Sequence, residues 1–235
     1  MSLSPTLATR ARTSMSLASR ILAMLLASLA LASSGCSALS HYNPTQSGLL
    51  TDYSGMSKDR FHVNYGLGIQ RNYSRNATCE EVGEVDSFYI ESITWVVDAE
   101  SRAGRDPTRR VVLTEALDAA FRQQLGMLRP VVDQPGPHSA RVRAVITDAR
   151  LSRPFTNAAL TAAGIAFPFV PIGPTFFGGA CVEAEVLTPD SRQIAAISCA
   201  SGGGPLDVVG YYTRSGHAKK AMRRAARELR QALTP

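Results

Sequence analysis

The 235-residue sequence has few of the patterns that mark a catalytic or metal site. Its four histidines, at positions 41, 62, 138 and 217, are far apart and form no His-Glu-x-x-His motif, so they indicate surface residues rather than a zinc site. No Gly-x-Ser-x-Gly motif occurs, and the glycines at 202–204 lack the lysine of a phosphate-binding loop. The sequence predicts no catalytic residue, no metal and no cofactor.

The apolar run near the amino terminus is too short for a membrane span. Residues 21–32 cannot cross a bilayer of ~30 Å as a helix, and they follow Arg20 and lead through small residues to Cys36. This is the pattern of an export signal. The segment resembles the lipobox of bacterial lipoproteins, except that Ser33 stands where that pattern usually has leucine. The resemblance implies that Cys36 carries a fatty acyl group such as palmitate and becomes the new amino terminus.

The sequence leaves two features of this signal open. Translation could begin at Met1 or at Met15, and both starts give the same mature chain. Cleavage after Ala32 or Ser34 would instead release a secreted protein without lipid. By resemblance to lipoprotein sorting, Ser37 after the cysteine implies an outer-membrane protein that faces the periplasm.

Length and charge predict one folded domain with a local basic surface. We expect a signal at 1–35, a flexible tether at 36–47 and a single α/β domain at 48–235. Removing the three arginines of the signal leaves 22 basic and 19 acidic residues, a net charge of +3. Six basic residues gather after residue 215, against one glutamate.

Periodicity predicts a βαβ unit in the first half of the domain. Residues 85–97 are rich in β-branched and aromatic side chains, as in a strand. A helix should begin at Asp106 and Pro107 and stop at Gly126, and residues 141–148 alternate as a second strand.

The second half predicts a hairpin and a last helix. Residues 180–187 and 193–200 flank a turn, residues 201–205 break the chain, and an apolar stripe at 218–233 marks the helix. The fold class is therefore α/β (α+β), a two-layer sandwich with a mixed four-stranded sheet and two amphipathic helices on one face.

Three short stretches carry a family resemblance. Residues 48–56, 143–148 and 179–185, together with the lipobox, look like the DUF3313 family of bacterial putative lipoproteins. That family has no established function, so the resemblance implies a periplasm-facing lipoprotein and transfers no catalytic residues. Leu49, Leu50, Tyr53 and Met56 of the first stretch could dock the leader onto the folded body.

The cysteines and two glutamates of the hairpin are candidate functional groups. If the hairpin turns around Asp190, opposite residues have numbers that sum to 380, and Cys181 and Cys199 could form a disulfide in an oxidising compartment. A slip of one residue would leave two free thiols. Glu183 and Glu185 share one strand face and could hold a metal or an acid/base pair, but a solvated sheet face is the favoured interpretation.

The last helix presents a basic face. It consists of Lys219, Lys220, Arg223, Arg224, Arg227 and Arg230. For an exported lipoprotein, this face could bind anionic lipid, and no nucleic acid is expected as a partner. The solvated face of a packed helix is the favoured interpretation.

Residues 155–179 contain no charged side chain and several prolines. Their large apolar groups, Phe167, Phe169, Phe176 and Phe177, are candidates for binding an envelope protein. A loop that folds back over its own sheet and completes the core is the favoured interpretation.

Two functional hypotheses follow: a lipid-anchored, non-catalytic interaction module of the envelope, and an envelope enzyme with an unrecognised polar site. We favour the first, and carriage of a small apolar ligand is a third reading. The partner, ligand, pathway and oligomeric state stay open.

Overall fold

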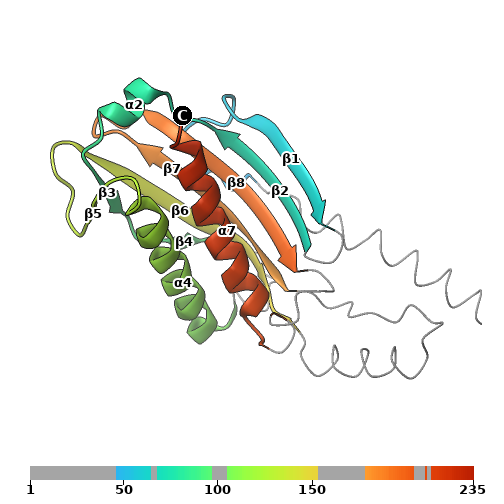
Figure 1. Ribbon diagram of the computed structural model, residues 1–235. Coiled ribbons are helices and arrows are strands. Elements are labelled where there is room, and N and C mark those ends of the chain that lie inside the picture. Colours follow the sequence, from blue (N-terminus) through green and yellow to red (C-terminus); the bar gives the residue numbers. More distant parts are fainter. Residues whose placement is uncertain (1–45, 65–67, 97–104, 153–177, 204–209, 211–212) are drawn as a thin grey trace, which may run out of the picture. The chain divides into compact units, whose positions relative to one another are not determined.

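The described strands form one sheet of mixed direction (Figure 1). The computed structural model describes residues 46–64, 68–96, 105–152, 178–203, 210 and 213–235. Its strands are β1 (Ser57–Asn64), β2 (Gly68–Arg75), β3 (Ser87–Ile90), β4 (Thr94–Trp95), β5 (Val131–Val132), β6 (Ser139–Arg150), β7 (Gly179–Leu187) and β8 (Gln193–Gly203). Its helices are α2 (Cys79–Gly83), α4 (Pro107–Leu125) and α7 (Gly216–Ala232). The strand order is β1-β2-β8-β7-β6-β3-β5, and β4 pairs with β6 beside β3.

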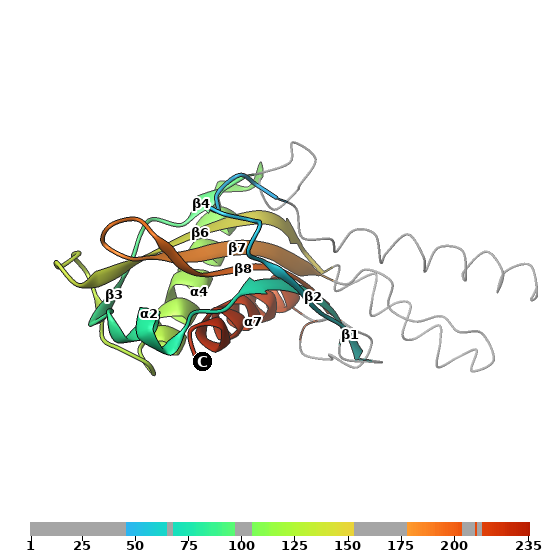
Figure 2. The same ribbon diagram turned by 90° about the horizontal axis from the view of Figure 1, so that it is seen from above.

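Helices α4 and α7 lie on one face of this sheet (Figure 2). The two helices contact each other, and α7 also packs on β7 and β8. At its carboxyl end, α7 is tied to the segment before α2, because Ala77 N–H donates to the Ala232 carbonyl over 2.8 Å. The predicted mixed α/β class is therefore confirmed.

Local signals fix the ends of α4 where the sequence predicts them. The Asp106 side chain accepts a hydrogen bond from the Arg109 amide, Pro107 occupies the first turn, and the helix is capped at Gly126. Strand β3 then pairs with β6 in parallel, so the predicted βαβ unit is confirmed.

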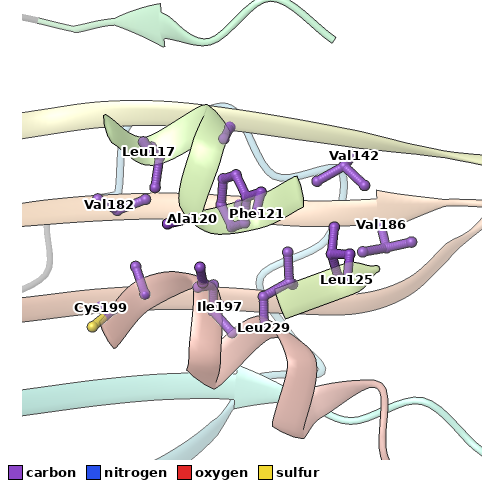
Figure 3. Packing of buried hydrophobic residues seen from close by; sticks show 14 of the residues in the cluster. Leu117, Ala120, Phe121, Leu125, Val142, Val182, Val186, Ile197, Cys199 and Leu229 are labelled. Carbon is purple, nitrogen blue, oxygen red and sulfur yellow. The ribbon is translucent and has the colours of Figure 1, made fainter. Parts of the chain in front are cut away.

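The core lies between the helices and the sheet (Figure 3). Fully buried apolar side chains of α4 meet those of α7 and of the three central strands. They include Leu117, Phe121 and Leu125 of α4, Leu229 of α7, and Val142, Val182, Val186 and Ile197 of β6, β7 and β8. The predicted apolar stripe of α7, from Ala218 to Leu233, is buried as expected.

The predicted sheet of four strands is wrong, because the described sheet has eight. The β1–β2 hairpin was missed, since both strands are rich in polar and charged residues and lack the apolar alternation of a half-buried strand. Strand β2 joins the sheet through an antiparallel ladder to β8.

The predicted strand at 85–97 is divided into β3 and β4, which both follow β6. Between them, the Glu91 carboxylate lies 3.6 Å from a guanidinium nitrogen of Arg141 and 4.0 Å from one of Arg143. The predicted break at 201–205 is also wrong in part, because β8 continues to Gly203.

No helix among the described residues is long and apolar enough to cross a membrane.

The packing predicts a large difference between two helix positions. Phe121 is fully buried and Val111 is 55% exposed on the same helix. We expect Phe121→Ala to lower the free energy of unfolding by about 3–5 kcal/mol, because it removes buried surface and leaves a cavity. Val111→Ala should change it by about 0.5 kcal/mol or less. Urea denaturation measures both, and equal effects would contradict the described core.

Candidate functional site

Two buried carboxylates lie on the face of the sheet opposite to the helices. Glu183 and Glu185 on β7 both have 0% exposed surface. The expected solvated sheet face is therefore wrong. Every residue of β7 is buried, because helices cover one face of this central strand and other parts of the chain cover the second.

Residues 46–56, which we call the strap, lie on this second face (Figure 2). The strap is not part of a described strand, and it leads directly into β1. It carries main-chain amides and hydroxyl groups to the two carboxylates beneath it. The predicted docking of this segment is confirmed for Leu50, which is 5% exposed, and for Tyr53, which contacts Glu183.

Glu183 is held by four donors, all of them uncharged. Ser47 donates from its amide over 3.0 Å and from its hydroxyl to Oε2, and the Tyr53 hydroxyl donates to the same oxygen over 3.1 Å. The Ser198 hydroxyl of β8 donates to Oε1 over 3.2 Å. Three of the four donated bonds therefore come from the strap.

Glu185 has both a cation and neutral donors. An Arg143 guanidinium nitrogen lies 3.2 Å from Oε1, and the Gln193 amide donates to Oε2 over 2.8 Å. The strap adds the Thr51 amide at 2.7 Å and the Thr51 hydroxyl at 3.2 Å. Arg143 also approaches Glu91, so a chain of charges runs from the β3–β4 junction to the buried site.

The strap has few other attachments to the sheet. Among the described residues, it makes no main-chain to main-chain hydrogen bond with a strand, and its own turn is closed by Met56 N–H donating to the Tyr53 carbonyl. The strap is therefore fixed by Leu50 and by the two carboxylates. Buried carboxylates need such partners, because an unpaired one is costly to desolvate.

The oxygens of both glutamates accept hydrogen bonds from the strap and from β8. The described residues include no group of three or more histidine, cysteine or acidic side chains that could hold a metal ion. One acceptor next to the site, Gln193 Oε1, is buried without a hydrogen-bond partner. Asp148 of β6 pairs with Arg150 over 3.1 Å.

The sequence does contain a pattern that indicates burial of Glu183 and Glu185, but the prediction relied on strand alternation instead. The stretches that form β7 and β8 are almost continuously apolar or small, which is typical of strands covered on both faces. Charged residues within such a stretch must be buried and must find partners. The identity of those partners, at 47, 51 and 53, could not be predicted without the fold.

His217 is also buried, at 2%, so the prediction of a surface histidine is wrong there. Its Nδ1 lies 2.6 Å from the Ser152 hydroxyl, and Ser152 N–H donates to the Arg214 carbonyl. A Cβ atom at Gly203 would lie 2.1 Å from the ring. Gly203 at the end of β8, and Gly210, thus allow the imidazole to pack against the main chain.

The cysteines do not form the predicted disulfide. The register sum of 380 holds at Leu187 and Gln193, but a bulge shifts the pairing by one residue, so Cys199 lies opposite Val182. Cys181 and Cys199 then point to opposite faces, and both are buried free thiols. Cys181 packs with Ala200, whereas Cys199 is part of the main core.

The basic face of α7 is only partly free for a partner. Arg223 and Arg227 are exposed, and the other four residues of the face are half-buried. Arg224 donates to the Ser201 hydroxyl over 2.9 Å and Arg230 to the Gln124 side chain over 3.0 Å, so these two also tie α7 to β8 and to α4.

Two further sets of predicted residues lie outside the described part of the chain. These are Cys36 in the amino-terminal segment, and four phenylalanines of residues 155–179, which we call the charge-free segment: Phe167, Phe169, Phe176 and Phe177. Their predicted roles stay predictions.

The two buried thiols should make the free energy of unfolding fall as the pH rises into the alkaline range. Burial raises the pKa of Cys181 from 9.0 to about 12, with the Asp148 carboxylate adding to the rise. Burial also raises the pKa of Cys199. Above pH 9 the unfolded chain binds fewer protons than the folded one, so each thiol should lower the stability by up to about 1.4 kcal/mol per pH unit.

We therefore expect Cys199→Ala to flatten the loss of stability between pH 9 and about 11. Urea denaturation across this range measures the slope. Cys79→Ala is the matched control, because Cys79 is exposed. Parallel slopes for wild type and Cys199→Ala would contradict the prediction.

Comparison with known proteins identifies the family but not a function. No curated protein matches the chain. A PelC variant dodecamer from Paraburkholderia phytofirmans has 12% identity and a TM-score of 0.41, covering 70% of this chain and 98% of its own. A second PelC dodecamer from this organism has 9% identity and a TM-score of 0.38, covering 70% and 97%. A family model described as "Protein of unknown function (DUF3313)" matches residues 45–229, and because this match spans most of the sequence, the chain belongs to that family.

Proposed function

We propose that the protein is a lipid-anchored, periplasm-facing lipoprotein of the outer membrane that acts as a non-catalytic interaction module. The observation that carries this proposal is the seating of the strap on Glu183 and Glu185. The strap begins ten residues after Cys36, so the segment between them is the tether from an acylated end to the folded body.

A binding role is supported by how the buried polar groups of the second face are used. The oxygens of Glu183 and Glu185 are engaged by strap, strand and arginine donors, and this use of carboxylates stabilises a structure rather than a transition state. The protein thus presents surfaces to the envelope, and its buried acids keep those surfaces in place.

Two surfaces are the proposed contacts. Arg223 and Arg227, the exposed pair of the basic face, suit the headgroups of anionic lipids. The four phenylalanines of the charge-free segment suit an envelope protein, because aromatic anchors supply much of the energy of such interfaces.

Acylation of Cys36 is the first test. Cells that express the protein should incorporate radiolabelled palmitate into it, and Cys36→Ser should abolish the label. Cys79→Ser is the control, because it removes an exposed thiol from the folded body without touching the signal. Unlabelled wild-type protein that is freely soluble would contradict the anchor.

Reversal of the exposed arginines is the second test. Arg223→Glu with Arg227→Glu should weaken binding to anionic vesicles at low salt, since each lost basic residue near such a surface is worth about 1 kcal/mol. Neither residue is buried, so the circular dichroism spectrum should not change. Vesicle sedimentation measures the binding, and unchanged binding by the folded variant would make this an ordinary solvated face.

A further inference from the structure

The strap resembles a bound peptide more than an integral part of the sheet. It supplies three donors to Glu183 and two to Glu185, yet it adds no main-chain ladder to the described strands. Its one buried side chain is Leu50. Recognition therefore rests on a short set of contacts that any identical segment would reproduce.

The site beneath the strap is incomplete without an occupant. With the strap removed, Glu183 would keep only the Ser198 hydroxyl among its described donors. Its side chain projects from the central strand β7, where it is fully buried when the strap is seated. Glu185 would keep Arg143 and Gln193. Glu183 is thus the group that requires a segment with amide and hydroxyl donors.

The connection between the strap and the body is a short exposed turn. Ser54 and Gly55 are exposed. One main-chain hydrogen bond of 3.3 Å joins Met56 N–H to the Tyr53 carbonyl, and the Asp52 carboxylate accepts two more, each of 2.7 Å, from the amide and the hydroxyl of Ser54. Directly after it comes β1, which is an edge strand of the described sheet. A change of backbone angles in this turn would swing the strap outward without disturbing a strand pair.

We propose that the strap is exchanged between two copies of the chain, so that Ser47, Leu50, Thr51 and Tyr53 of one copy occupy the carboxylate site of another. Exchange of an identical element costs little, because the same contacts form in both arrangements. This inference deepens the proposed function by naming a partner. It rests on that function only for the closeness of two copies anchored in one membrane.

Two complementary full-length variants test the exchange. One carries Glu183→Gln, which places an amide donor against the strap donors and so weakens the seating of any strap on that body. The other carries Leu50→Asp and Thr51→Pro, which remove the buried apolar group of its own strap and both strap donors to Glu185, the Thr51 amide and hydroxyl. Both also carry Cys36→Ser, so that no anchor is present and failure here would not bear on acylation.

Energy transfer between dyes reports the pairing. Cys79 is exposed whereas Cys181 and Cys199 are buried, so each variant can be labelled at one native thiol. We expect transfer in the mixture of the two variants and little or none within either variant alone. Excess synthetic peptide of residues 46–56 should abolish it, and should bind the Glu183→Gln body about tenfold more weakly or worse.

Two controls make a negative result decisive. Gln46→Ala alters an exposed strap position that contacts neither carboxylate. When it replaces the strap double variant, the transfer should be weaker, because its own intact strap competes for the site. Thermal melting followed by circular dichroism establishes that every variant is folded. No transfer between the folded complementary variants overturns the exchange, even where the free peptide binds, because the strap would then act only within its own chain.

Discussion

The burial of the central hairpin on both faces is the constraint on which the other contacts depend. Strands β7 and β8 are covered by helices on one side, so their alternate residues must be covered on the other side as well. Two of those residues are glutamates, and a carboxylate without donors in such a place would cost several kcal/mol, roughly. The strap meets both needs, since Leu50 excludes water and the amides and hydroxyls around it satisfy the charges.

The helix side is governed by a different interaction. There the contacts are apolar and close-packed, with Phe121 and Leu229 placed among small and branched residues of the strands. Polar ties such as Arg230 to Gln124 and Arg224 to Ser201 flank this core without entering it. The helix side thus contains the main apolar core, while the second face contains the two carboxylates and their donors.

The features predictable from sequence were those set by local chemistry. Asp106, Pro107 and Gly126 determine where α4 begins and ends, and the stripe of α7 needs only helical periodicity. The predicted register of β7 and β8 was wrong by one residue, because a bulge near Ile194 shifts the pairing between Val186 and Leu187. The contact between the strap and the carboxylates could not be predicted either, because the donors are about 130 residues away from the carboxylates along the chain.

The position of the strap has a mechanical consequence. A force applied from the amino-terminal side would reach Ser47 first, then Thr51, and then the turn before β1, so the contacts would be loaded one after another rather than together. Bonds loaded in series yield at a lower force than a strand sheared along its whole ladder, such as β2 against β8. The strap would therefore peel before the sheet is strained, and tension applied ahead of Ser47 would be relieved at the carboxylates without reaching the core.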